Sequence, residues 1–275
     1  MDRLADVLEL APLLKAKGEA FVLATVVRTV AATAAKAGAK AIIRADGSIS
    51  EGWIGGGCAR GAVLKAAREA LADGQARLIS VQPPDVLQEH GVAAGEKREG
   101  VRFARNTCPS HGTMDIFIEP MLPRPQIVLC GSSPVAVALA GLAAKLGFSV
   151  TACAPPAEQS AFAEVDRRIG DYALPATGDG DRYVVVSTQS RGDEAALTAA
   201  LATDARYVAF VGSRLKAQTL KTALAARGVD GERLSLVRAP AGLDLGAIGP
   251  EEIALSIMAE IVAFRRGREP RSSRP

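Results

Sequence analysis

Three glycines and a cysteine stand together at Gly55, Gly56, Gly57 and Cys58, directly before a segment with helical spacing. The first turn of a helix offers unpaired backbone N–H groups and the positive end of the helix dipole, and both favour an anion. Because a thiolate is an anion, a cysteine there tends towards a low pKa and high reactivity. The turn therefore predicts nucleophilic sulfur chemistry, or the holding of a group that a thiolate can ligate. The alternative is a small buried residue in a tight turn.

A second cysteine, Cys108, lies in a segment flanked by proline and glycine, three residues before His111. The two side chains could supply two metal ligands or a thiol–imidazole pair. A structural zinc site needs four such ligands, and Cys58 is the one further thiol that could join them, so the sequence disfavours zinc. His111 is more simply a solvated loop histidine. We expect Cys108 to be a partner of Cys58 if the fold brings the two together.

The other two cysteines, Cys130 and Cys153, end two predicted parallel strands. Packing in the core is the simpler interpretation of both. Strand ends line the ligand crevice of open α/β sheets, however, so either thiol could touch a ligand there. The sequence has no Cys-x-x-Cys motif, which argues against a thioredoxin-like protein.

The turn after the first of these strands lies where a dinucleotide-binding fold carries its G-x-G-x-x-G/A signature. Gly131 and Ala136 fit the signature, but Ser133 replaces the middle glycine that lets the backbone approach a pyrophosphate. The ribose-binding carboxylate, expected about 20 residues further on, would fall near Ala154 and is missing. These departures argue against NAD(P) as a cofactor. A helix N-terminus with Ser132 and Ser133 can still accept a phosphate.

Polar residues follow two more predicted strands, and the strand-end rule places them at the same edge of the sheet. We expect these residues to contact one ligand: Gln189, Asp193, Gly212, Ser213 and Arg214. Asp193 and Ser213 could equally be ordinary helix caps. Arg214 opposes the dipole of the helix that it begins, which favours an anionic ligand over a solvent-facing role.

The elements that position these residues follow from apolar spacing and from glycine and proline. In the first half we expect helices at 4–17 and 59–73, and strands at 20–30, 40–44, 48–54, 77–82, 101–105 and 115–119. Asp46 and Gly47 predict a hairpin between two of the strands. Residues 85–100 are expected to be a loop, and strands 101–105 and 115–119 to pair with each other.

The second half alternates strands with helices. We expect strands at 126–130, 148–153, 181–187 and 207–211, and helices at 134–146, 192–202, 214–226 and 250–265. This alternation predicts a doubly wound parallel sheet. Prolines at 120, 123 and 125 mark a linker. The predicted organisation is an N-terminal mixed α/β domain at 1–121, a Rossmann-like domain at 126–266 and a flexible basic tail at 267–275.

Composition excludes several classes of protein. The chain has 275 residues, of which 48% are hydrophobic, so it can form a substantial core. Its net charge of +3 comes from 33 basic and 30 acidic residues, and the one basic cluster is the tail, which argues against nucleic-acid binding. We find no apolar run long enough to span a membrane and no signal peptide. Four widely separated cysteines indicate a reduced, cytoplasmic protein.

Taken together, the motifs resemble the XdhC/CoxI family of xanthine dehydrogenase accessory proteins over nearly the whole length of the chain. The segments that carry the resemblance are 24–29, 37–40 and 54–58 in the first half, and 207–214, 242–247 and 250–254 in the second. Residues 188–189 and 106–110 are similar to the carbon monoxide dehydrogenase branch. One departure is Gly131-Ser132-Ser133-Pro134, where the family usually has Gly-x-Gly-His.

The resemblance implies a maturation factor for a molybdenum hydroxylase, such as carbon monoxide or xanthine dehydrogenase. It would bind the molybdenum cofactor and assist its sulfuration and insertion, with Cys58 as the main thiol and a contact to molybdenum. The implied partners are the hydroxylase apoenzyme, a cysteine desulfurase and a second copy of the chain. The protein would then be an accessory protein, not an enzyme. Two alternatives stay open: a nucleotide-dependent oxidoreductase or sulfurtransferase acting through Cys58, and a scaffold that only docks the target and the sulfur donor.

Overall fold

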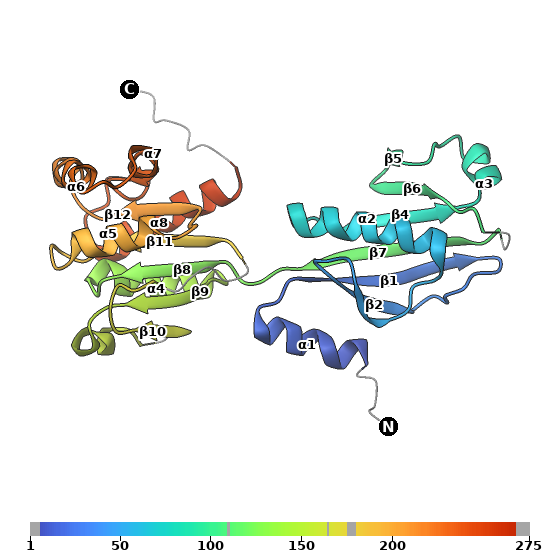
Figure 1. The fold of residues 1–275 in the computed structure, drawn as a ribbon, viewed down its shortest axis with the longest axis horizontal. Helices are drawn as coiled ribbons and strands as arrows, with labels where there is room; N and C mark the ends of the chain where they lie inside the picture. Colours follow the sequence, from blue (N-terminus) through green and yellow to red (C-terminus); the bar gives the residue numbers. More distant parts are fainter. Residues whose placement is uncertain (1–5, 109–110, 164, 175–179, 268–275) are drawn as a thin grey trace. The chain divides into compact units, whose positions relative to one another are not determined.

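The chain folds into two compact α/β units, residues 1–123 and 124–275 (Figure 1). The computed structural model describes residues 6–108, 111–163, 165–174 and 180–267. The α/β fold class predicted for both halves is confirmed. From residue 268 on, the predicted basic tail lies outside the described residues. Within the described ranges, no helix has the length and apolarity that crossing a membrane requires.

A seven-stranded sheet forms the first unit, in the order β3-β2-β1-β7-β4-β6-β5. The strands are β1 (Phe21–Val30), β2 (Lys40–Arg44), β3 (Ile49–Gly52), β4 (Arg77–Gln82), β5 (Lys97–Arg98), β6 (Val101–Arg105) and β7 (Thr113–Met121). Helix α2 (Gly57–Asp73) covers one face over β1, β7 and β4, and α1 (Val7–Lys17) packs against β2 and β3. The predicted hairpin at Asp46 and Gly47 is confirmed, because β2 and β3 pair antiparallel.

The core of this unit lies between α2 and the sheet. Alternate residues of β7, Met114, Ile116 and Ile118, point into it and are buried. Val63 and Ala70 of α2 pack against the same cluster. Strand β7 lies under α2 in the middle of the sheet, where it pairs with β1 on one side and with β4 on the other.

Two predictions for this unit are wrong. Residues 85–100 are not simply a loop, because they include most of helix α3 (Pro84–Glu89) and strand β5. Proline at the first helical position and Asp85 in the first turn are the helix-start signals that were overlooked. Strands β6 and β7 do not pair either: β4 lies between them, parallel to β6 and antiparallel to β7.

The second unit is a six-stranded parallel sheet in the order β10-β9-β8-β11-β12-β13. Its strands are β8 (Gln126–Cys130), β9 (Ser149–Cys153), β10 (Arg167–Ile169), β11 (Arg182–Val186), β12 (Tyr207–Phe210) and β13 (Val237–Arg238). Counted within the unit, this is the order 3-2-1-4-5-6 of the Rossmann fold. The predicted doubly wound sheet is therefore confirmed, although β10, β13 and the short helix α7 (Gly231–Ser235) were not predicted.

Helices cover both faces of this sheet. On one face α4 (Pro134–Lys145) and α8 (Pro250–Arg265) pack around Ile127 and Leu129, and on the other α5 (Asp193–Leu201) and α6 (Arg214–Ala226) pack around Val128 and Val184. The strand order reverses between β8 and β11, which is where ligands bind in folds of this kind.

Gly131, directly after β8, is fixed by a close approach of the main chain. Its φ is +100°, and a Cβ there would lie 2.4 Å from the carbonyl oxygen of Ser187, which follows β11. Only glycine satisfies both conditions. This contact therefore sets the spacing of the two strand ends at the reversal point.

We predict that Gly131→Ala lowers the free energy of unfolding by about 2–4 kcal/mol, because it adds a left-handed alanine and a clash with backbone. Gly141→Ala is the matched control. Gly141 is exposed within α4 with open space around its Cα. Alanine there is expected to raise the free energy of unfolding by about 0.5–1 kcal/mol. Urea denaturation of both variants measures the difference, and equal stabilities would contradict the prediction.

Candidate functional site

The glycine–cysteine turn forms the N-terminus of α2, as the spacing predicted. Gly56 is the N-cap residue, Gly57 begins the helix and Cys58 is its second residue. The structure describes the backbone of Cys58 and not its side chain. Gly56 provides no side-chain cap, and the first turn contains no acidic residue. No carboxylate or hydroxyl from the start of α2 therefore accepts a hydrogen bond from the N–H groups of this turn.

Contacts at both ends of α2 fix its position along β7. Gly55 has a φ of +108°, and a Cβ there would lie 3.0 Å from the methyl carbon of Met114, near the start of β7. At the other end of the helix, a Cβ on Gly74 would lie 3.3 Å from Leu122, just past the end of β7. The N-terminus of α2, with Cys58, therefore lies over the start of β7.

The Cys108 loop joins β6 to β7 and so reaches the same start of β7. Asn106 organises it: its side-chain N–H donates to the carbonyl of Gly112 at 2.6 Å, and its side-chain oxygen accepts from the N–H of Cys108 at 2.9 Å. A Cβ on Gly112 would lie 2.2 Å from the carbonyl oxygen of Ala32, so the loop presses against the β1–β2 connection. Cys108 is exposed. Pro109 and Ser110 lie outside the described residues.

The fold thus gathers parts of three connections at one end of the first sheet: residues 31–39, residues 55–58, and residues 106–108 with 111–112. We call this region the thiol end. It contains both cysteines of the first unit, and the pairing of Cys58 with Cys108 stays a prediction from the sequence. His111 follows in the same loop, and its Nδ1 lies 3.9 Å from a carboxylate oxygen of Asp85, with both side chains exposed. Among the described residues, no group of three or more His, Cys, Asp or Glu could hold a metal ion.

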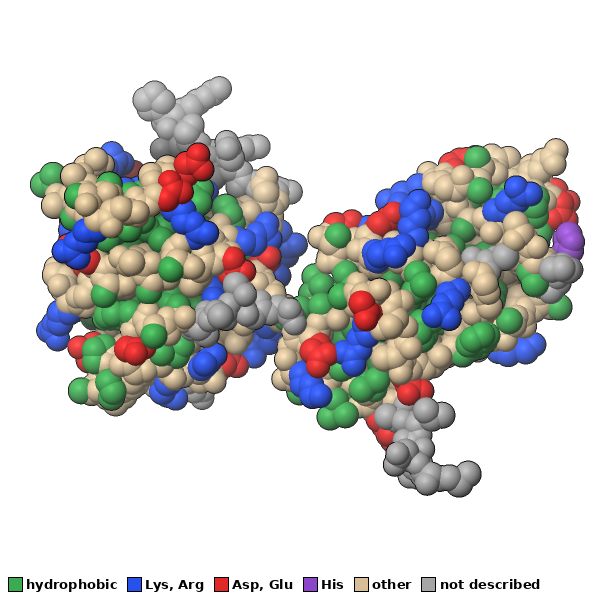
Figure 2. Space-filling model, in the orientation of Figure 1, with side chains coloured by type: hydrophobic (Ala, Val, Ile, Leu, Met, Phe, Trp, Pro, Cys, Tyr) green, Lys and Arg blue, Asp and Glu red, His purple; other side chains and the backbone are tan. Residues whose placement is uncertain are grey.

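Basic side chains surround the thiol end. Lys36, Arg60 and Arg105 are exposed in or beside its segments, and Arg60 stands in the first turn of α2, where it opposes the dipole. Arg28 is exposed near the end of β1 and pairs with Asp115 at 2.5 Å. Figure 2 shows Lys and Arg side chains spread over the visible face of this unit. Exposed Lys36, Arg60 and Arg105 thus offer positive charge to an anionic ligand.

A hydrogen-bonded chain that the sequence analysis missed holds Asp115 in place. Ser80 donates to Asp115 at 2.5 Å, the side-chain amide of Gln82 donates to Ser80 at 2.8 Å, and Gln82 in turn contacts His90 at 3.1 Å. Ser80 and Gln82 are buried, so these bonds satisfy polar groups that would otherwise be costly. Their alternation along β4 was the available signal, because it places both side chains on the face opposite the core.

In the second unit, the predicted site residues meet at the carboxyl edge of the sheet. Cys130, Val186 and Phe210 are aligned in register at the ends of β8, β11 and β12. The segments that follow these strand ends carry the predicted ligand residues: Gly131, Ser132, Ser133, Gln189, Gly212, Ser213 and Arg214. The edge predicted from the strand-end rule is therefore present.

Several of these residues already have structural partners. Ser133 is the N-cap of α4, accepts from the N–H of Ala136 at 3.1 Å and shares a 2.5 Å hydrogen bond with Ser187. Ser213 is the N-cap of α6. A Cβ on Gly212 would lie 2.5 Å from the ring of Phe210. Ser213 therefore acts as a helix cap, which is the alternative that the sequence left open for it.

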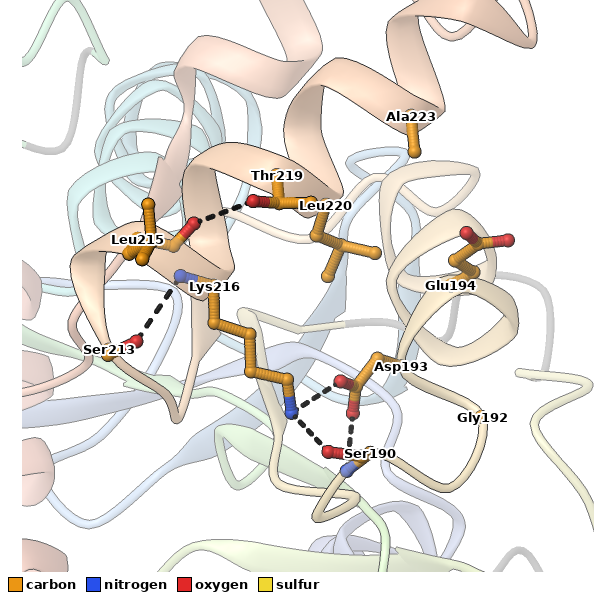
Figure 3. Close-up of a pocket in the computed structure, with 10 residues that line it drawn as sticks. All are labelled: Ser190, Gly192, Asp193, Glu194, Ser213, Leu215, Lys216, Thr219, Leu220 and Ala223. Carbon is orange, nitrogen blue, oxygen red and sulfur yellow. Dashed lines mark hydrogen bonds and ion pairs between the residues drawn. The ribbon is translucent and has the colours of Figure 1, made fainter.

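A surface pocket of about 690 Å³ lies between the first turns of α5 and α6 (Figure 3). At its floor the ammonium of Lys216 lies 2.6 Å from Asp193 and 2.9 Å from the hydroxyl of Ser190, and 5.4 Å from the centre of the Phe210 ring. Asp193 also accepts from the N–H of Ser190 and from the hydroxyl of Thr188. These bonds hold the loop after β11 together and neutralise the charge of Lys216.

A carboxylate that the sequence analysis missed reaches the Gly131 turn. Ala154 is buried and carries none, but Glu158, in the short 3₁₀ turn after β9, accepts a hydrogen bond from the hydroxyl of Ser132. Arg191 lies 3.6 Å from the other oxygen of Glu158. The available signal was a glutamate slightly further along the chain than the usual ribose-binding carboxylate. The 3₁₀ turn places its side chain beside the strand ends.

The turn does not fit the pyrophosphate of a dinucleotide. Proline at the first position of α4, Pro134, has no N–H to donate, and the N–H of Ala136 is taken by Ser133. Glu158 adds a negative charge beside Ser132. A pyrophosphate here would lose donors and gain repulsion. The Rossmann strand order is therefore present without the donor set that a dinucleotide uses.

We predict that NADH and NADPH do not bind measurably to this edge. The test is isothermal titration calorimetry, in which either cofactor is added to about 10 µM protein up to about millimolar concentration. We expect only heats of dilution. Saturable binding that weakens in a Ser132→Ala or Gly131→Ala variant would contradict this prediction.

The thiols of Cys130 and Cys153 pack against each other on adjacent strands. The two residues are aligned in register and both are fully buried. Their mutual hydrogen bond, together with burial, raises the pKa of the Cys130 thiol well above its usual value. A neutral, buried thiol is unreactive. The packing interpretation of these two cysteines is therefore the one that the structure favours.

We predict that iodoacetamide at pH 8 labels Cys108 in the native protein and leaves Cys130 and Cys153 unlabelled. Both thiols are fully buried and so out of reach of the reagent, and the raised pKa of Cys130 also keeps that thiol protonated at pH 8, whereas the thiolate is the species that reacts. Peptide mass spectrometry before and after denaturation measures the difference. Labelling of Cys130 at the rate of Cys108 would refute the assignment.

Family models match both units of the chain. The model described as XdhC and CoxI family matches residues 14–82, and the model described as XdhC Rossmann domain matches residues 127–261. The second match falls in the parallel sheet unit, and the first includes the glycine–cysteine turn. The resemblance found in the sequence is therefore confirmed in each half.

Two curated relatives and one solved structure are similar to the chain. "Uncharacterized protein YqeB" of Escherichia coli is 30% identical over 82% of this chain and 40% of its own length. A Bacillus subtilis protein described as a probable xanthine dehydrogenase subunit is 30% identical over 56% of this chain and 47% of its own length. The chain thus spans less than half the length of each relative. A structure described as a xanthine dehydrogenase from Bacillus halodurans matches 98% of both chains at 19% identity, with a TM-score of 0.45. On the two family matches, the chain belongs to the XdhC and CoxI family.

Proposed function

We propose that this protein is a maturation factor for a molybdenum hydroxylase. In this role it binds the molybdenum cofactor and assists its sulfuration and its insertion into the apoenzyme. The protein acts as an accessory protein in the cytoplasm and catalyses no reaction of its own. The observation that carries the proposal is the uncapped N-terminus of α2, with Cys58 in its first turn, in a chain of the XdhC and CoxI family.

The chemistry of the thiol end supports the cofactor part of the proposal. The molybdenum cofactor carries a phosphate and a metal centre, and a soft thiolate is a suitable ligand for such a metal. The N–H groups of residues 57–59 have no side-chain cap, so they are suited to an anion. Cys58 would contact the metal centre, and Arg60 would face the negative charge of the ligand.

Two further residues support the same assignment. Cys108 is exposed in the loop that meets the start of β7, and we propose it as a second thiol at the site. Gly112 keeps that loop against the β1–β2 connection, because no side chain fits at its position. The thiol end therefore holds its loops by main-chain packing.

The target and the partners follow from the relatives. One relative is described as a probable xanthine dehydrogenase subunit, so we propose a hydroxylase of the xanthine dehydrogenase type as the partner of this chain. The carbon monoxide dehydrogenase branch, based on residues 188–189 and 106–110, stays a prediction from the sequence. We also propose a cysteine desulfurase as a partner, because sulfuration of the cofactor requires a sulfur donor.

We predict that Cys58→Ser weakens cofactor binding at least about ten-fold, since serine keeps the shape of the turn and removes the soft ligand. The test titrates the protein, under anaerobic conditions, with molybdenum cofactor released from a purified molybdoenzyme. Trp53 is the single tryptophan of the chain and stands five residues before Cys58, so its fluorescence reports on the turn. Molybdenum retained after gel filtration provides an independent measurement.

Gly61→Ala is the matched control for this experiment. Gly61 lies one turn further along α2 with open space at its Cα, so alanine is expected to leave binding unchanged. Full binding by Cys58→Ser would refute the role of the thiol. Absence of binding by the wild-type protein would favour the docking scaffold, and transfer of a persulfide from Cys58 to a small acceptor would favour a sulfurtransferase.

A further inference from the structure

The inner face of α2 is fixed against the sheet of the first unit. Val63, Ala66, Ala67 and Ala70 are buried in the core cluster that lies between this helix and the sheet. These contacts set the rotation of α2 about its own axis. The residues that the helix presents outward are therefore determined.

The outward face of α2 carries three basic residues. Arg60, Lys65 and Arg68 are exposed, and none of them forms an ion pair with any other residue that the structure describes. At about 100° per residue they fall within about 140° of arc, and no acidic residue of α2 stands in that arc. From Arg60 to Arg68 the distance along the axis is about 12 Å. We call these three residues the basic stripe, and Figure 2 shows Lys and Arg side chains in the region where Figure 1 draws α2.

The acidic residues of α2 are engaged elsewhere. The helix has two of them, Glu69 and Asp73, and none before Glu69. Glu69 forms an ion pair with Arg102 of β6, and Arg77 of β4 pairs with Asp73 and lies 3.7 Å from Glu69. Both carboxylates thus neutralise bases of the sheet. The basic stripe is left without a counter-charge from its own helix.

This charge pattern is unfavourable for the helix that carries it. Lys65 and Arg68 stand three positions apart, so they are neighbours of like charge on the helix surface, and such pairs destabilise a helix. Arg60 opposes the dipole in the first turn. A solvated helix face usually mixes the two signs of charge, and the basic stripe does not. A negative surface placed against the stripe would offset both unfavourable interactions.

We propose that the basic stripe is a docking surface for an acidic surface of another protein. Polybasic segments that bind anionic membranes use about four to eight cations, and DNA-binding proteins neutralise about six to ten phosphates, so three cations are few for either. Leu64 lies between Arg60 and Arg68 on the helix surface and is half-buried. An apolar contact within a charged rim is typical of a protein interface.

The place of the stripe gives docking a consequence. Arg60 stands in the first turn of α2, which belongs to the thiol end, and the stripe runs from there along the helix. A protein bound along the stripe would bring the adjoining part of its own surface to the thiol end. Charges of this kind steer encounter and fix orientation more than they add affinity. The docking surface is independent of whether the thiol end holds a cofactor.

Binding of an acidic helical probe to the full chain tests the proposal. The probe is a fluorescein-labelled helical peptide of about 16 residues with glutamates along one face, and its control has lysine in place of each glutamate. Fluorescence anisotropy at low salt is expected to show saturable binding of the glutamate peptide alone. This binding is expected to weaken as salt is added, because salt screens exposed charges. No binding of the glutamate peptide would overturn the proposal.

Paired substitutions test the position of the docking surface. Lys65→Ala together with Arg68→Ala is expected to weaken peptide binding about three- to ten-fold, since two exposed ion pairs are lost. Lys15→Ala together with Lys17→Ala is the matched control, because it removes the same charge from exposed positions of α1 and is expected to have no effect. Alanine favours helix in both variants, and circular dichroism verifies their folding. Equal effects would show a response to net charge alone and would overturn the assignment to α2.

Two further ligands distinguish a protein partner from other polyanions. Phosphatidylserine vesicles and a short DNA duplex are each expected to show no difference between the wild-type protein and the variant that lacks Lys65 and Arg68. A larger loss of vesicle or DNA binding than of peptide binding in this variant would assign the stripe to lipid or to nucleic acid. Either result would overturn the proposal.

Titration with molybdenum cofactor separates docking from the proposed function. The variant that lacks Lys65 and Arg68 keeps Cys58 and Arg60, so its cofactor binding is expected to match the wild type. Loss of cofactor binding with peptide binding intact would assign these charges to the cofactor and overturn the docking surface. A wild-type protein that binds the peptide at the stripe but binds no cofactor would refute the proposed function and support the docking surface.

Discussion

Main chain packs directly on main chain at the ends of both sheets, and the candidate sites depend on this packing. A Cβ on Gly112 would lie 2.2 Å from the carbonyl of Ala32, and one on Gly131 would lie 2.4 Å from the carbonyl of Ser187. The first contact holds the Cys108 loop at the start of β7, where α2 also begins. The second sets the spacing of the strand ends at the reversal point of the parallel sheet. In both places the geometry of the site is built from backbone, and side chains are added to it.

Helix capping makes the thiol end of the first unit chemically different from the carboxyl edge of the parallel sheet. Ser133 caps α4 and Ser213 caps α6, so side chains of the protein use part of the anion-binding capacity of these helix starts. Helix α2 begins with glycine and has neither a side-chain cap nor an acid in its first turn. An anionic ligand therefore has more to gain at α2 than at the Rossmann edge. This difference in satisfied donors, more than the fold of either unit, is the reason for placing the proposed cofactor site at the thiol end.

Periodicity predicted the elements that are long enough to show it. Strands β8, β9, β11 and β12, and the helices between them, follow the predicted segments closely, because buried parallel strands are continuous apolar runs. Strands β5 and β13 have two residues each and show no period. The pairing of β6 with β4 was missed because nearness in sequence suggests a hairpin, whereas the buried alternation of β7 places that strand between β1 and β4. Glu158 was missed because a 3₁₀ turn, not sequence spacing, returns it to Ser132.

The second unit illustrates how a fold and its usual ligand can part. Its strand order is that of dinucleotide-binding proteins, and its first turn keeps the glycine that the close approach of the backbone requires. Phosphate binding needs more than this: it needs free N–H groups and a positive field. Pro134 removes one donor, Ser133 occupies another and Glu158 places a carboxylate beside Ser132. Three side chains are enough to change what the edge can hold, while the sheet that presents them stays the same.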